Sequence, residues 1–96
     1  MHIILLKYTG NKSKAAQFME LHKAWIKRGF DDGVFLLVGS LEPDAGGGIF
    51  AHNTSRDDLR RRVEADPFVS EGIVRAEVLE VSPVRVDRRL EFLAVP

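Results

Sequence analysis

Short apolar segments alternate along the chain with two longer amphipathic segments, and their order restricts the topologies open to it. The apolar segments have the branched and aromatic content of strands, and they lie at residues 2–8, 34–38, 49–53 and 73–81. Two segments have apolar side chains at helical spacing: residues 14–31, and a second segment opened by Ser55. The order β-α-β-β-α-β predicts an α+β, ferredoxin-like fold, in which both helices cover one face of a four-stranded antiparallel sheet.

Turn and cap residues mark the ends of these elements. Ser13 and Ser55 are suited to cap the two helices, because a serine hydroxyl can accept from a free backbone N–H in the first turn. The second helix should end at Asp66, since the residue before Pro67 avoids helical geometry. Residues 44–48, which end in three glycines, predict a loop that joins strands two and three as a hairpin.

The length of 96 residues predicts a single domain over residues 1–96. Residues 68–72 predict a short turn or helical bend before the fourth strand. Residues 84–96 follow the fourth strand as a C-terminal tail, whose alternating apolar positions could form an extra strand.

The composition excludes several classes of protein. Lys and Arg number 14, as do Asp and Glu, and a net charge of zero argues against a nucleic-acid binder. The absence of cysteine excludes disulfides, iron–sulfur clusters and thiolate zinc, and the three histidines lack metal-binding spacing, so we expect no metal site. No apolar run approaches the ~20 residues of a membrane span, and no signal-peptide pattern is present, so we expect a cytoplasmic protein that binds no membrane.

The chain is rich in large apolar residues for its length, with six Phe and one Trp. A domain of this size buries only about 60–65% of the surface that its unfolded chain exposes. The predicted fold also leaves one face of the sheet without helices. We therefore expect that a second copy covers this face and that the protein is a homodimer.

His22 is the most informative polar residue, because it lies on the apolar stripe of the first helix. Histidine changes charge near neutral pH and suits a general acid or base, although a packed structural histidine fits the position as well. A catalytic histidine works best beside a carboxylate that fixes its tautomer. Asp66 is the best candidate for that carboxylate, and a simple Asp-Pro helix end explains it equally well. The spacing leaves open whether Asp66 reaches His22.

Four further residues could contact a substrate. Gly39 would let a ligand approach the sheet backbone and Ser40 could donate a hydrogen bond, or the two could simply begin a loop. Trp25 and Phe68 could wall a pocket for an aromatic ligand, or could belong to the core. The glycines at 46–48 do not fit a phosphate-binding loop, because a strand rather than a helix follows them.

The chain resembles YciI-like proteins with a YCII-related domain, in the dimeric α+β barrel group. The resemblance extends to about Pro83 and rests on the early first strand, Leu21-His22-Lys23, Leu36 to Pro43, and Ala65 to Gly72 with the strand that follows. It implies a dimer with its sheets face to face and a His–Asp dyad near the interface, carried onto His22 and Asp66. The chain departs from the family in having Phe18 and Met19 where an arginine is common.

The resemblance also implies chemistry without a cofactor. One activity of the family is dehydrochlorination of a chlorinated hydroxyhydroquinone in aromatic degradation. We therefore expect a small lyase or isomerase that transfers a proton on an aromatic or ring-cleavage substrate, with dehydrochlorination as the specific candidate. Two alternatives are a cofactor-free or heme-using monooxygenase of the same barrel group, and a non-catalytic module that binds small molecules.

Overall fold

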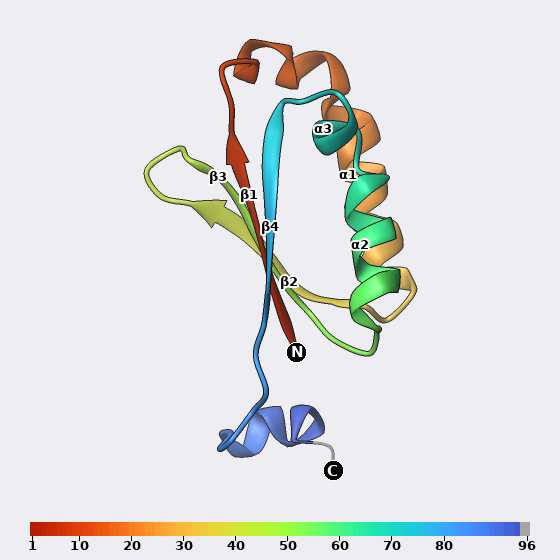
Figure 1. Cartoon of the computed structure of the whole chain (residues 1–96), viewed down its shortest axis with the longest axis vertical. Coiled ribbons are helices and arrows are strands. Elements are labelled where there is room, and N and C mark those ends of the chain that lie inside the picture. The colour runs from red at the N-terminus through yellow and green to blue at the C-terminus, as the bar shows by residue number, and fades with distance from the viewer. Residues whose placement is uncertain (95–96) are drawn as a thin grey trace.

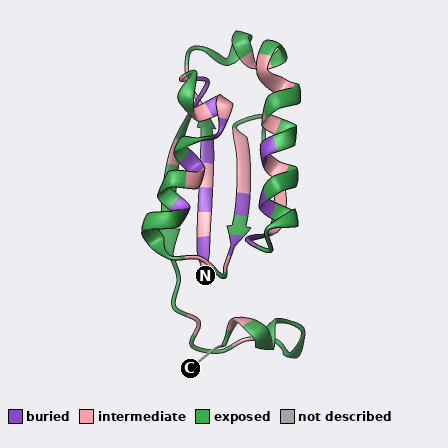
Figure 2. Cartoon of the chain, turned by 90° about the vertical axis from the view of Figure 1, so that its right-hand side faces the viewer, coloured by how far each residue is buried: buried purple, intermediate pink, exposed green. Residues whose placement is uncertain are grey.

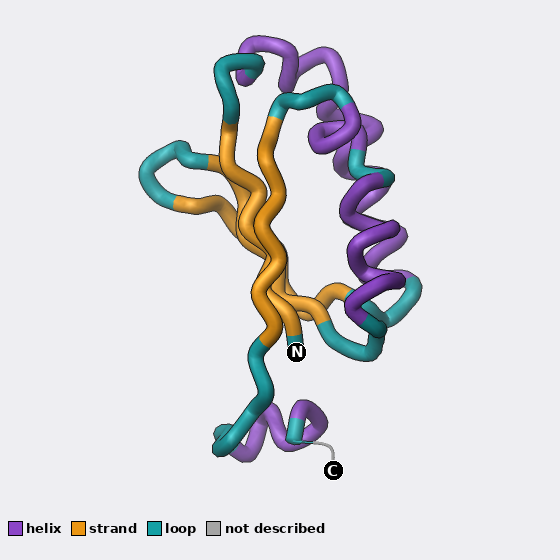
Figure 3. Tube along the Cα trace, in the orientation of Figure 1, coloured by secondary structure: helices purple, strands orange, loops and turns teal. Residues whose placement is uncertain are grey.

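The computed structural model describes residues 1–94, and its elements confirm the predicted α+β architecture (Figure 1). The strands β1 to β4 form one antiparallel sheet in the order β2-β3-β1-β4, and they comprise His2–Tyr8, Phe35–Leu41, Gly46–Ala51 and Val74–Glu80. Helix α1 (Ala15–Asp31) connects β1 to β2, while α2 (Arg56–Glu64) and the short α3 (Pro67–Ser70) connect β3 to β4. Figure 3 shows all three helices on the same side of the sheet. Over residues 1–94, no helix has the length and apolar character needed to cross a membrane.

The core lies between these helices and the face of the sheet beneath them (Figure 2). The inner strand β1 alternates: Ile4 and Leu6 are buried under the helices, while Ile3 and Leu5 are half-buried on the other face. Strand β1 lies inside the sheet, paired with β3 on one side and with β4 on the other. A fully buried Leu or Ile contributes about 1.5–3 kcal/mol, so burial on the helix side holds the two layers together.

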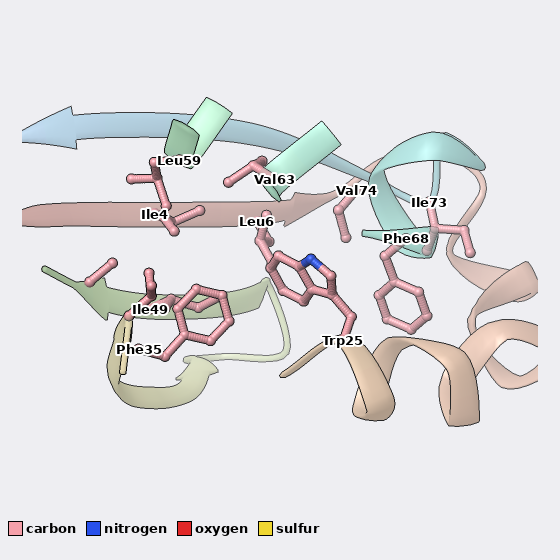
Figure 4. Packing of buried hydrophobic residues seen from close by; sticks show 12 residues of the cluster. Ile4, Leu6, Trp25, Phe35, Ile49, Leu59, Val63, Phe68, Ile73 and Val74 are labelled. Atoms are coloured by element: carbon pink, nitrogen blue, oxygen red, sulfur yellow. The ribbon is translucent and has the colours of Figure 1, made fainter. Parts of the chain in front are cut away.

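Trp25 joins α1 to the sheet and to the second crossover (Figure 4). Its ring is buried and meets the Phe35 ring edge-on, with ring centroids 5.1 Å apart. Its indole Nε1 donates to the Arg62 backbone carbonyl at 2.9 Å, which satisfies the one polar atom of the ring. Trp25 is thus part of the core rather than of an exposed face.

The two predicted serine caps have different outcomes. Ser55 caps α2, and its hydroxyl accepts from the Asp58 N–H at 3.1 Å. Ser13 does not cap α1, because it lies inside a short 3-10 helix, η1 (Lys12–Lys14), that runs directly into α1. The N-cap of α1 is Lys14, whose backbone is already helical and whose side chain makes no cap hydrogen bond.

The prediction that residues 44–48 form a loop is wrong for the glycines at its end. Gly46 to Gly48 belong to β3 and pair with both β1 and β2, and β2 itself continues through Ser40 to Leu41. Glycine has a low intrinsic preference for strands, and pairing on both sides overrides it here. Gly46 is required by close approach: it has a φ of 134°, and a Cβ there would lie 1.8 Å from the Leu6 carbonyl oxygen.

The predicted extra strand in the tail is also wrong for the described residues. A second 3-10 helix, η2 (Arg88–Leu93), occupies this part of the tail below the sheet in Figure 1, and residues 95–96 of the predicted tail lie outside the described residues. The Asp87 carboxylate accepts from the Arg89 N–H at 2.9 Å and caps this turn, which favours a helical start over an extended one. The Phe92 ring lies edge-on to His52, with ring centroids 5.5 Å apart.

The face of the sheet opposite the helices carries a row of apolar side chains. The row crosses all four strands in register and consists of Leu37, Phe50, Ile3 and Leu79. Cross-strand neighbours share a face, so these side chains form one continuous stripe, which we call the apolar row. Leu37, Phe50 and Leu79 are 50%, 40% and 42% exposed, which is high for large apolar side chains set side by side.

His2 lies buried at the start of β1, and burial lowers its pKa from the ordinary value while the nearby Glu80 carboxylate partly opposes the shift. Unfolding returns the ring to water, so the unfolded chain takes up the proton more readily and stability falls as pH drops through about 6.5. We expect the free energy of unfolding of His2→Gln to decline less than that of the wild type as pH falls from about 7.5 to about 5.5. Urea unfolding at both pH values measures this, and equal declines would contradict it.

Candidate active site

His22 projects from the middle of α1 onto the ring of Phe68. The two rings are parallel within 2°, with centroids 4.0 Å apart, and the Trp25 ring lies 5.8 Å away on the same helix. The His22 side chain is 13% exposed. The ring is therefore held in one orientation by aromatic neighbours while part of it still reaches solvent.

Asp66 meets His22 from the other crossover. The distance from His22 Nδ1 to Asp66 Oδ1 is 2.7 Å, and the Asp66 side chain is completely buried. Asp66 is the N-cap of α3, with an extended backbone before Pro67, and its Oδ1 also accepts from the Phe68 N–H at 3.0 Å. The extended backbone of Asp66 thus interrupts the helical path after α2, as predicted, and Asp66 also begins α3, where its cap points the carboxylate at His22.

A cavity of about 320 Å³ opens beside His22, between α1 and the sheet. This volume lies in the range of small-molecule sites, about 300–1,000 Å³. His22 and Phe68 line the cavity on the helix side, and Gly39 and Ser40 of β2 line it on the sheet side. Asp66 lies behind His22 and does not line the cavity.

Trp25 does not wall the pocket and has instead the core position that was considered as its alternative. It lies in the core behind His22, 2% exposed, and does not line the cavity. Of the two aromatic residues considered as pocket walls, only Phe68 is one. The physical reason is that the Trp25 ring is held in the core, by the hydrogen bond from its indole to the α2 backbone and by its edge-on contact with Phe35.

Several cavity residues were missed from sequence, and three of them share a face of α1 with His22. Met19, Lys23 and Ile26 line the cavity, and their spacing around position 22 follows one helical stripe. That spacing was a usable signal. The Lys23 side chain borders the cavity and is 63% exposed, and its ammonium lies 3.9 Å from the Glu20 carboxylate.

The other two histidines lie away from this cavity, in β1 and after β3. Within residues 1–94, no three histidine or carboxylate side chains stand close enough together to hold a metal ion. Arg60 and Arg61 pair with Asp57 and Asp58 on the exposed side of α2, as expected for a solvated helix face.

Residues 1–84 match the YCII-related domain. The chain belongs to the YCII-related family. No curated protein matches it in sequence. The part of this YCII-related protein that contains β1 to β4, His22 and Asp66 lies entirely within the match, whereas η2 lies beyond it.

Among solved structures, this YCII-related protein is similar to 5-chloro-2-hydroxyhydroquinone dehydrochlorinase from Burkholderia phenoliruptrix AC1100, in complex with 2,5-dihydroxybenzoquinone. The TM-score is 0.68, and the match covers 84% of this chain and 93% of that chain at 17% sequence identity. At this identity the similarity establishes a shared fold.

The dyad of this YCII-related protein can hold a proton at a defined atom. An ionised carboxylate only accepts hydrogen bonds, so Asp66 facing Nδ1 places the imidazole hydrogen on Nδ1. The lone pair of the neutral ring is then on Nε2, which becomes the basic atom. When Nε2 takes a proton, the carboxylate 2.7 Å from Nδ1 stabilises the resulting imidazolium.

Proposed function

We propose that this protein is an enzyme that needs no cofactor and uses His22 as a general base on a hydroxylated aromatic ring. The observation that carries the proposal is the 2.7 Å contact between His22 Nδ1 and a fully buried Asp66, on the wall of a cavity of small-molecule size. The His22 ring is partly exposed at the cavity wall, where a small molecule can reach it, while the buried carboxylate fixes its Nδ1 edge.

The character of the cavity supports an aromatic substrate. Its walls are mainly apolar, with Phe68 beside His22 and branched side chains of the sheet opposite. Its polar residues are few and include Ser40, Tyr8 and Lys23. A planar ring that carries hydroxyl groups and partial negative charge fits this combination. The similar dehydrochlorinase, whose structure holds 2,5-dihydroxybenzoquinone, supports the same substrate class.

The specific reaction we propose is loss of HCl from a chlorinated hydroxyhydroquinone. In its keto tautomer, the ring carbon that carries chlorine is saturated. His22 Nε2 removes the proton of a hydroxyl group, the electron pair moves through the ring, and chloride leaves with both electrons of the C–Cl bond. The products are a hydroxyquinone, chloride and the proton on His22, which passes to solvent. No oxidant is required, since the electrons leave on chloride.

The test of this function is chloride release from 5-chloro-2-hydroxyhydroquinone by purified protein with no cofactor added. We expect release well above the spontaneous rate, and we expect it to persist after dialysis against EDTA. A wild-type rate equal to that of buffer would overturn the proposed reaction, and a rate lost on dialysis and restored by a metal ion would overturn the chemistry assigned to the dyad.

Ser40 is proposed to donate a hydrogen bond to a ring oxygen at the edge away from the hydroxyl that His22 deprotonates. Its side chain borders the cavity from β2, opposite α1. We expect Ser40→Ala to lower kcat/KM by about 3- to 10-fold, the value of one net hydrogen bond of about 0.5–1.5 kcal/mol. Ser70→Ala is the matched control, because Ser70 lies outside the cavity on α3. Equal activity of Ser40→Ala and the wild type would remove Ser40 from the mechanism.

We also propose that the protein is a homodimer joined through the apolar row. The row lies on the face without helices, where a second copy could cover it. We expect Phe50→Glu to shift the protein to monomers at micromolar concentration, because it buries a charge in the interface. Sedimentation velocity measures this, with Val84→Glu as the control, since Val84 is fully exposed in the tail. A monomeric wild type would contradict the proposal.

A further inference from the structure

The three consecutive glycines of β3 are not all required by the backbone. Gly46 is, because of its φ of 134° and the nearby Leu6 carbonyl. Gly47 is not: its φ is ordinary, and a Cβ there would meet only the Gly39 carbonyl oxygen, at an ordinary van der Waals distance of 3.5 Å. The backbone would accept a Cβ at position 47. The absence of a side chain there is therefore not required by the fold, and its effect must be sought in the space above the strand.

Gly47 lies on the helix-facing side of β3, as its register partners show. It pairs with Leu6 of β1, which is buried beneath the helices, and it is two residues from Ile49, which is also buried there. A side chain at position 47 would therefore point toward α1. Gly47 lines the cavity from the sheet, and His22 lines it from α1.

Two neighbouring rows of this face differ in side-chain size. The first row is made of branched residues throughout, namely Val38, Ile49, Ile4 and Val78. The next row on the same face is mostly small, namely Ser40, Gly47, Leu6 and Ala76. The side chains that project from the sheet toward α1 are therefore shortest at Ser40 and Gly47, and both residues line the cavity. The small row creates room that a branched row would fill.

We propose that Gly47 determines the size of the ring that the cavity admits, and this inference rests on the proposed function. His22 takes the proton at one edge of the ring, and the opposite edge lies over the bare backbone of Gly47 beside Ser40. The substrate class is then a hydroxylated ring with room for further ring atoms or substituents on the edge away from His22. A methyl group at position 47 narrows this space, and an isopropyl group closes it.

The experiment compares Gly47→Ala and Gly47→Val with the wild type. Gly10→Ala and Gly10→Val are the matched controls, because a Cβ at Gly10 has no atom within 4 Å and Gly10 lies in a turn outside the cavity. The probes are 2,5-dihydroxybenzoquinone and the larger 2-hydroxy-1,4-naphthoquinone, titrated by calorimetry. Thermal unfolding is measured for every variant.

We expect Gly47→Ala to weaken binding of the naphthoquinone by about tenfold or more and to change binding of the smaller ring by less than about threefold. Gly47→Val should weaken both by more than about tenfold, while the Gly10 variants bind like the wild type. The melting temperatures of both Gly47 variants should equal or exceed that of the wild type, because a side chain restricts the unfolded strand. Lost binding with retained stability separates a filled cavity from a damaged fold.

Wild-type affinity for both rings in Gly47→Val would overturn the inference and leave the proposed function standing. Lower melting temperatures in both Gly47 variants would overturn it as well, because the fold itself would then need the glycine. If the wild type binds neither ring, the proposed ring chemistry fails and the role of Gly47 fails with it. Loss of binding in the Gly47 variants alone, with chloride release intact in the Gly10 variants, supports both.

Discussion

His22→Gln is expected to fold like the wild type and to lose about 10²–10⁴-fold in kcat, the usual contribution of a positioned general base. The glutamine amide can still donate to the buried Asp66 carboxylate, which His22 now meets at 2.7 Å. It cannot take up a proton at neutral pH. The loss should therefore fall on kcat, with little change in the affinity for a bound quinone. Steady-state kinetics with chloride detection, together with binding of 2,5-dihydroxybenzoquinone, separates the two effects.

His22→Ala adds a structural cost that His22→Gln avoids. Removing the ring leaves the Asp66 carboxylate with the Phe68 N–H as its remaining partner among the described residues, since its Oδ2 has none. A buried polar group that loses its partner costs about 1–3 kcal/mol, so urea unfolding should show that loss for alanine and much less for glutamine. Turnover of either variant within threefold of the wild type would remove His22 from the mechanism.

Asp66→Asn is the second change with a large expected effect, and it acts through His22. Asparagine is a good N-cap and can still accept from the Phe68 N–H, so stability should change by less than about 1 kcal/mol. With its oxygen in the place of Asp66 Oδ1, the amide can still accept from both partners, but it has no negative charge with which to stabilise an imidazolium. We expect kcat to fall by about 10²-fold or more.

Asp66→Ala should lose both activity and stability. It removes the cap of α3, worth about 1 kcal/mol, and the hydrogen bond to His22. The comparison of asparagine with alanine therefore separates the positioning role of Asp66 from its role in the fold. If Asp66→Asn keeps its activity within threefold, or if its kcat falls only in proportion to its stability, Asp66 has no role beyond structure.

The fold was largely predictable because each element has a local signal. Strand β1 has four consecutive apolar residues at Ile3 to Leu6, and Ser55 caps the helix that it was expected to cap. The failures come from places where distant pairing decides the structure. The glycines of β3 have a turn composition, and only their pairing with both neighbouring strands makes them a strand. In the tail, the cap made by Asp87 favours a 3-10 helix over the strand that the alternating apolar residues indicated.

The candidate site was predictable in its residue types and less so in its contacts. His22 and Asp66 were visible as a histidine on an apolar stripe and a carboxylate before proline, but their 2.7 Å contact depends on how α3 packs against α1. Trp25 lies three residues after His22, so its spacing along α1 is compatible with a place on the cavity wall. Its hydrogen bond to the Arg62 carbonyl instead holds it in the core. Spacing along one helix cannot distinguish these two outcomes.

The most direct measurement is the anaerobic reaction of 5-chloro-2-hydroxyhydroquinone with the wild type and with His22→Gln, quantifying chloride and hydroxyquinone together. Removing oxygen prevents quinone formation by autoxidation. General-base elimination by His22 predicts one chloride released for each hydroxyquinone formed by the wild type, and a rate about 10²–10⁴-fold lower in the variant. Chloride release at equal rates in the two proteins, or none above the rate in buffer, would contradict it.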